Sequence, residues 1–201
     1  RTQPEVLAAG NIYDVTAATA EKKYDFKELL KQGKEIWVVN TTQPGNVTCQ
    51  RDVITDVKET NVSFTRYFRN NTRQSEENLT GLLYDWNDMT RKDVPYNGLF
   101  IFSHKGWHSQ ETLTYLTGDA SCAVVSVLPF GPFDDKGKPV QWTDLRMTSS
   151  KVSGSPPNDC LEAFNNITKL AQLTLLKPYL VKIRKTLYIV SMCWHLRIQV
   201  Q

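Results

Sequence analysis

Eight short runs of β-branched, aromatic and aliphatic residues dominate the chain between positions 36 and 147. The runs are 36–42, 52–55, 62–69, 79–86, 99–104, 112–116, 122–128 and 140–147. Turn residues separate them, as in Gln43-Pro44-Gly45 and Gly131-Pro132. Because no helical pattern lies between the runs, the sequence predicts about eight antiparallel strands around one core, in a barrel or a sandwich.

Helical patterns flank these runs on both sides. Before them, Phe26, Leu29 and Leu30 share one helical face, and Gly33 follows where a short helix would end. After them, residues 158–171 carry apolar side chains at helical spacing behind polar residues that can cap the first turn. The sequence therefore predicts one short helix before the strands and one longer helix after them.

The length of the chain fits a single folded unit. A chain of 201 residues buries one substantial core. We expect one domain over 1–201, with a strand core at about 34–150, and we assign no structure to the tail at 177–201.

Six of the twelve asparagines begin an Asn-x-Ser/Thr sequon, where chance would give roughly two. They are Asn40, Asn46, Asn61, Asn70, Asn78 and Asn166. No apolar run reaches the roughly 18 residues of a membrane span, and no signal-like leader follows Arg1, so we expect Arg1 to begin a mature, secreted glycoprotein. The net charge of +3 is evenly spread, which argues against a nucleic-acid partner.

The four cysteines are Cys49, Cys122, Cys160 and Cys193. An even number in an exported chain predicts two disulfides, and the absence of a CxxC pair argues against zinc or redox chemistry. Three pairings are possible, and their spacing alone does not choose among them.

The chain lacks the motifs of the common catalytic sites. Ser153-Gly154-Ser155 does not have the frame of a nucleophile elbow, and no glycine-rich phosphate loop occurs. His104 and His108 flank a turn-like Lys105-Gly106 step, so we interpret them as exposed turn residues and expect no metal site. We therefore expect neither an enzyme nor a cofactor.

Several segments occur in an order that is typical of one family. A tryptophan strand at Trp37 precedes Asn46-Val47-Thr48-Cys49 and the aromatic run Phe64-Thr65-Arg66-Tyr67-Phe68. Later come Gln141-Trp142-Thr143-Asp144 and the helix Asp159-Cys160-Leu161-Glu162-Ala163-Phe164-Asn165. Over roughly 24–170 this order resembles the salivary lipocalins of ticks, the histamine-binding-protein family.

The resemblance implies an all-β fold. The expected fold is an eight-stranded antiparallel up-and-down lipocalin barrel with a short N-terminal helix and a C-terminal helix packed outside, and we expect the protein to be a monomer. It also implies that Cys122 pairs with Cys160 and Cys49 with Cys193, although the spacing from Cys160 to Cys193 is longer than the family pattern. Gly33 lies four residues before Trp37, so the general lipocalin Gly-x-Trp signature is absent.

The family captures small host mediators inside the barrel, and some members bind host proteins instead. Amine-binding members carry two acids that are replaced here, at Cys122-Ala123-Val124 and Val140-Gln141-Trp142. The sequence therefore favours a hydrophobic or lipid-acid ligand such as an eicosanoid, fatty acid or sterol. The alternatives are a biogenic amine held by Asp144 or Asp85, and a protein partner held by loops.

Strand alternation, combined with sequons that must face water, predicts which side chains line the barrel. The predicted ligand-binding residues are Trp37, Val39, Phe64, Arg66, Phe68, Leu83, Asp85, Phe100, Phe102, Trp142 and Asp144. Among apolar neighbours, the Arg66 guanidinium would hold the carboxylate of a lipid acid. The alternative is that Arg66 pairs with Asp85 or another internal acid, or lies at the barrel mouth in water.

Overall fold

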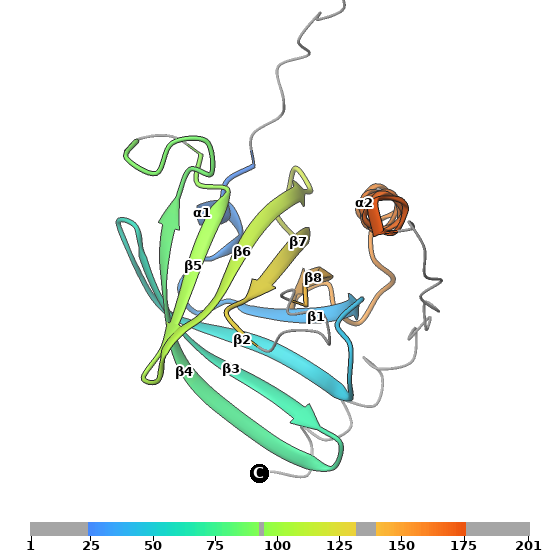
Figure 1. Ribbon diagram of the computed structural model, residues 1–201, viewed down its shortest axis with the longest axis horizontal. Coiled ribbons are helices and arrows are strands. Elements are labelled where there is room, and N and C mark those ends of the chain that lie inside the picture. Colours follow the sequence, from blue (N-terminus) through green and yellow to red (C-terminus); the bar gives the residue numbers. More distant parts are fainter. Residues whose placement is uncertain (1–23, 93–94, 132–139, 176–201) are drawn as a thin grey trace, which may run out of the picture.

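The structure is a computed structural model that describes residues 24–92, 95–131 and 140–175. Eight strands follow one another along the chain and around the barrel (Figure 1). They are β1 (Glu35–Thr41), β2 (Val47–Lys58), β3 (Asn61–Asn70), β4 (Arg73–Tyr84), β5 (Gly98–Ser103), β6 (Gly106–Leu116), β7 (Cys122–Pro129) and β8 (Trp142–Thr148). Each strand pairs antiparallel with the next, and β8 pairs with β1, so the sheet is closed. The predicted up-and-down barrel is confirmed, and the sandwich is excluded.

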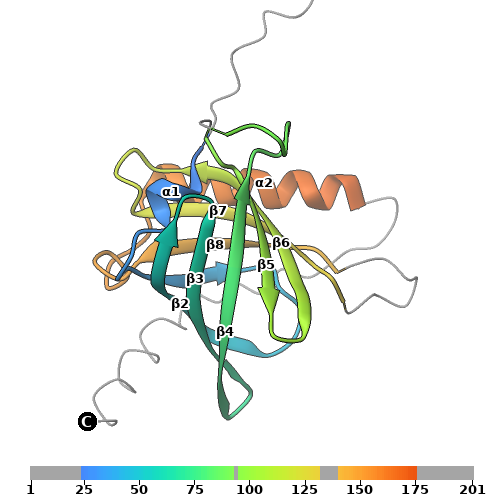
Figure 2. The same cartoon turned by 90° about the vertical axis from the view of Figure 1, so that its left-hand side faces the viewer.

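A single helical turn, α1 (Phe26–Leu29), seals one end of this barrel. The Asp25 carboxylate caps it by accepting a 2.9 Å hydrogen bond from the Lys27 N–H. Phe26 and Leu29 are fully buried against the barrel core, and the Phe26 N–H donates to the Tyr96 carbonyl at 2.8 Å. The turn between β3 and β4 lies at the opposite end (Figure 2). That end is the mouth of the barrel.

Helix α2 (Asn158–Leu175) lies outside the barrel, beside β7 and β8, as the sequence predicts (Figure 2). Phe164 packs against Leu145 of β8, and the Cys122–Cys160 disulfide ties α2 to β7. Cys193 and the tail at 177–201 lie outside the described residues, so the Cys49–Cys193 bridge stays a prediction. No described helix is long and apolar enough to cross a membrane.

The alternation predicted from two sequons agrees with the structure in β3 and β4. Asn61 and Asn78 are exposed, whereas Phe64, Arg66 and Leu83 are buried. On the outer face, the Thr65 hydroxyl donates to the Asn78 side-chain oxygen at 2.9 Å. The residues on one face of each strand therefore follow from a single exposed asparagine.

The prediction that Trp37 and Val39 point inward is wrong. A β-bulge between Val38 and Asn40 adds one residue to β1 and reverses the alternation. Trp37 instead packs against Val152 on the outer wall, and Val39 packs against the outer clusters.

The prediction that Phe100 and Phe102 face inward is also wrong. In β5 the alternate residues Leu99 and Ile101 belong to the core, while Phe100 stacks on Tyr84 with ring centroids 4.4 Å apart. Gly81 on β4 explains why Leu99 can point inward, because a Cβ at position 81 would come within 2.6 Å of Leu99 Cδ1. The interior at this level has room for a leucine only because its neighbour has no side chain.

A charged belt and an outer cup inside the barrel

Apolar side chains fill the half of the barrel next to α1. They include Ile36, Ile54, Val62, Phe64, Leu79, Leu83, Leu99, Ile101 and Val125, all of them buried. Their strands present β-branched and aliphatic residues at every second position, which suits a narrow closed interior.

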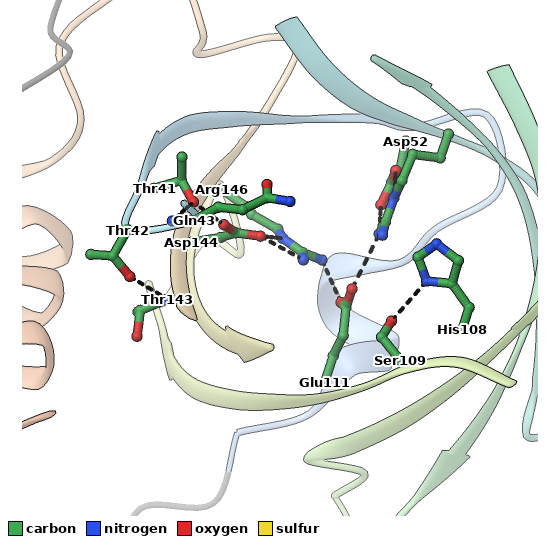
Figure 3. Close-up of polar contacts among 11 residues, drawn as sticks. Thr41, Thr42, Gln43, Asp52, His108, Ser109, Glu111, Thr143, Asp144 and Arg146 are labelled. Atoms are coloured by element: carbon green, nitrogen blue, oxygen red, sulfur yellow. Dashed lines mark hydrogen bonds and ion pairs between the residues drawn. The ribbon is translucent and has the colours of Figure 1, made fainter. Parts of the chain in front are cut away.

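One step nearer the mouth, the apolar lining gives way to five buried charged residues, which we call the charged belt. They are Asp52, Arg66, Glu111, Asp144 and Arg146, contributed by β2, β3, β6 and β8. The exposed fraction is 0% for Glu111 and no more than 6% for any of the five. Figure 3 shows Asp52, Glu111, Asp144 and Arg146 meeting across the barrel interior.

Hydrogen bonds and ion pairs connect the belt end to end. Arg66 donates to the two carboxylate oxygens of Asp52 at 2.7 and 2.8 Å, and to Glu111 Oε1 at 3.2 Å. Arg146 donates to Glu111 Oε2 at 2.5 Å and to Asp144 Oδ2 at 2.9 Å. Glu111 therefore bridges the two guanidiniums.

Outside the bridge, Asp144 has a second partner, because its Oδ1 accepts a hydrogen bond from the Thr41 hydroxyl at 2.7 Å. Burial disfavours the charged form of both Glu111 and Asp144, but the two carboxylates differ in how strongly the neighbouring guanidiniums offset it. Arg146 and Arg66 overcome the effect of burial on Glu111 and lower its pKa to about 2. For Asp144, burial dominates over the Arg146 contact and the pKa is raised.

The structure corrects the role predicted for Arg66. The side chain points into the barrel, but its guanidinium is already engaged by Asp52 and Glu111. Arg66 therefore pairs with internal acids, which was the alternative to a ligand-binding role, but these acids are Asp52 and Glu111 and not Asp85. Asp85 is buried beyond the end of β4, where its Oδ1 accepts the Asn87 N–H at 3.0 Å.

Beyond the belt, four half-exposed side chains surround the mouth, and we call this region the outer cup. They are Phe68, Glu77, His108 and Trp142. Phe68 follows Arg66 on the inner face of β3, Glu77 lies directly opposite Arg66 on β4, and Trp142 packs against the barrel core. These four side chains are partly exposed, whereas the belt is buried.

Two polar features distinguish the outer cup. His108 Nε2 lies 3.4 Å from Glu77 Oε2, and its Nδ1 lies 3.1 Å from the Ser109 hydroxyl. The Trp142 Nε1 hydrogen is buried and has no hydrogen-bond partner. His104 is exposed in the turn, as predicted. The prediction that His108 is an exposed turn residue is wrong, since His108 belongs to β6 and faces the cup.

The belt and the cup together carry an excess of negative charge. In the belt, the carboxylates of Asp52, Glu111 and Asp144 surround the guanidiniums of Arg66 and Arg146, and in the cup the Glu77 carboxylate lies beside the neutral His108. Burial and the nearby Arg66 lower the pKa of His108, so this imidazole is neutral at physiological pH. The potential in the cup therefore favours a cation over an anion.

Four of these charged residues are absent from the sequence-based site. They are Asp52, Glu77, Glu111 and Arg146. For Arg146 a signal existed, because it lies two residues beyond Asp144 and four beyond Trp142 on the same strand face. Asp52 and Glu111 lie on strands without a sequon, where the sequence does not reveal which face is buried.

A gap in the barrel wall separates the mouth-side ends of β1 and β2. These strands pair only from Glu35 to Trp37, and the cleft beyond is lined by residues that include Val38, Asn40 and Cys49. Its volume is about 20 Å³, which holds roughly one water molecule. This cleft is therefore too small for an organic ligand. Among the described residues, no group of three potential ligands could hold a metal ion.

A closed, eight-stranded up-and-down barrel with one helix outside it is the architecture of the lipocalins. No protein-family model and no curated protein matches this chain.

Three of the similar solved structures have low sequence identity to this chain. The siderocalin Ex-FABP is 10% identical, with a TM-score of 0.48 over 70% of this chain and 86% of that one. A bovine odorant-binding protein is 13% identical, with a TM-score of 0.44 over 72% and 87%. A dog lipocalin allergen is 12% identical, with a TM-score of 0.40 over 70% and 83%. These likenesses concern the fold alone, and the resemblance to tick salivary lipocalins stays a resemblance.

Proposed function

We propose that this protein sequesters a small organic cation with an aromatic or apolar body, such as a biogenic amine, in the outer cup of its barrel. The observation that supports this most is that carboxylates outnumber guanidiniums in the belt and cup while both guanidiniums are engaged. This reverses the order of ligand classes that the sequence favours, in which a lipid acid comes first.

An anionic ligand would lack a partner in this site. To bind Arg66 it would have to displace Asp52, which makes two hydrogen bonds to the guanidinium. The displaced carboxylate would remain buried without its counter-ion, which costs several kcal/mol, on the order of 3 to 5. A lipid carboxylate is therefore disfavoured both by the local potential and by the hydrogen bonding already present.

A cationic ligand would find suitable groups in the outer cup. Glu77 is 34% exposed and has one neighbour, His108, at 3.4 Å, so its carboxylate can accept an ammonium group. Phe68 and Trp142 present aromatic surface to the same space, and aromatic faces attract cations as well as apolar groups.

We further propose that the chain acts outside the cell as a glycosylated monomer that captures a host mediator. Five of its six sequon asparagines are exposed, and Asn40 is half-buried beside the wall cleft. The Cys122–Cys160 disulfide also suits an oxidising compartment.

A charge series of closely matched ligands would test the proposed function. Isothermal titration calorimetry at pH 7.4 would compare phenethylamine, 2-phenylethanol and 3-phenylpropionate, which are cationic, neutral and anionic, with histamine, serotonin and arachidonate added. We expect the cations to bind at least about tenfold more tightly than their neutral and anionic counterparts, a difference of about 1.4 kcal/mol. Tighter binding of phenylpropionate or arachidonate would overturn the assignment in favour of a lipid-acid binder.

A further inference from the structure

We propose that His108 is a proton-operated release residue, which competes with the bound cation for the Glu77 carboxylate when the surroundings become acidic. This inference rests on the proposed function and adds a mode of regulation to the same site. It concerns a half-exposed histidine that the amine-binding role does not itself require.

The geometry places the imidazole where an ammonium group would otherwise bind. His108 Nε2 lies 3.4 Å from Glu77 Oε2, and both side chains are about one-third exposed, at 31% and 34%. A neutral imidazole leaves the charge of Glu77 available to a ligand. An imidazolium would form an ion pair with the same carboxylate and add a positive charge to the cup.

The other charged groups near His108 come from four strands. Arg66 of β3 opposes its protonation, whereas Glu111 of β6 and Asp52 of β2 favour it, as does Glu77 of β4. Burial is the largest influence and, with Arg66, lowers the pKa of His108. The residues paired with its two chain neighbours, Trp107 and Ser109, are Phe102 and Ile101 on β5 and Pro129 on β7, none of which titrates.

The direction of the coupling follows from linkage. Because the proton and the ligand cation both add positive charge beside Glu77, each weakens the binding of the other. Protonation of His108 becomes extensive only below its lowered pKa, so affinity for a cation holds at neutral pH and falls in acid. Two unit charges about 5 Å apart repel by about 3 kcal/mol at an effective dielectric constant of 20, so a loss of affinity of tenfold or more is expected only once His108 is fully protonated.

The test measures phenethylamine binding by calorimetry at pH 7.4 and pH 5.5 in the whole protein and in His108→Gln. Phenethylamine keeps its charge over this range, and 2-phenylethanol serves as the uncharged control. We expect the wild-type dissociation constant to rise at pH 5.5, by at most about tenfold because the pKa of His108 lies below its ordinary value, and the ratio of the two constants to approach one in His108→Gln. Binding of 2-phenylethanol should change little with pH in either protein.

Two results would overturn the inference while leaving the proposed function intact. They are a wild-type affinity for phenethylamine that is the same at both pH values, and an equal loss in wild type and His108→Gln, which would point to Asp144 or Glu77 instead. Absence of phenethylamine binding at pH 7.4 would overturn the proposed function itself and the inference with it. If His108→Gln does not fold, nuclear magnetic resonance of wild-type His108 decides, because bound phenethylamine must then lower its pKa.

Discussion

Arg66 and Glu77 lie directly opposite each other on β3 and β4, yet the Arg66 guanidinium turns away to Asp52 on β2. Both oxygens of Asp52 accept from it, at 2.7 and 2.8 Å. This choice of partner leaves Glu77 with His108 as its neighbour at the barrel mouth. As a result, the charged belt is buried and fully paired, whereas the Glu77 carboxylate stays partly exposed at the mouth.

Glu77 should dominate the affinity for cations. Glu77→Gln removes the reachable carboxylate but keeps its shape, so we expect the dissociation constant for phenethylamine to rise about tenfold or more, measured by calorimetry at pH 7.4. Glu76→Gln is the matched control, because Glu76 is the next residue on β4 and is exposed on the outer face. Equal effects of the two substitutions would indicate that only the overall charge of the protein matters.

Trp142 and Trp37 should respond differently to ligand. Trp142 borders the outer cup, whereas Trp37 packs against Val152 outside the barrel. We expect phenethylamine, which does not fluoresce with tryptophan excitation, to change the fluorescence of the wild type and of Trp37→Phe. Trp142→Phe should lose most of that change. The reverse result would place the ligand on the outer wall.

Glu111 should contribute strongly to stability. Its carboxylate is 0% exposed and bridges Arg66 and Arg146, so Glu111→Gln leaves two buried guanidiniums short of a counter-charge. We expect the free energy of unfolding in urea at pH 7 to fall by about 3 kcal/mol. Glu162→Gln on the exposed face of α2 should change it by less than about 0.5 kcal/mol. A similar small loss for Glu111→Gln would mean that the belt contributes little to stability.

The contribution of Glu111 should depend on pH in a defined direction. Its pKa is about 2 in the folded protein, below the ordinary value of 4.5, so ionised Glu111 stabilises the fold. This stabilisation is fully present above about pH 5 and is lost as the pH falls toward 2. Urea unfolding of wild type and Glu111→Gln across this range should therefore give curves that converge in acid. Parallel curves would contradict the lowered pKa.

Local patterns were sufficient to predict the barrel. Alternating strands, turn residues and two helical segments identified all eight strands and both helices, although the strand at 52–55 extends in the structure to Val47–Lys58. The two exposed sequons on β3 and β4 also oriented those strands correctly, because alternation propagates from one residue whose face is known.

The site was less predictable for two physical reasons. A bulge in β1 inserts one residue and reverses the faces of Trp37 and Val39, and such an insertion leaves no clear mark in the sequence. In β5 both faces carry large apolar residues, so alternation alone does not reveal that Leu99 faces the core and Phe100 the outside. Where both faces are apolar, packing against neighbouring strands decides the orientation.

The sequence by itself determined the number and order of strands, the helices at either end and the inward direction of Arg66, because each depends on local pattern and strand period. Only the tertiary structure decided what Arg66 binds. Asp52 and Glu111 lie 14 and 45 residues away along the chain, and closure of the barrel brings both to one guanidinium. A buried guanidinium that is already paired with carboxylates is not available to an anionic ligand. Closure of the barrel therefore changed the expected ligand from an anion to a cation.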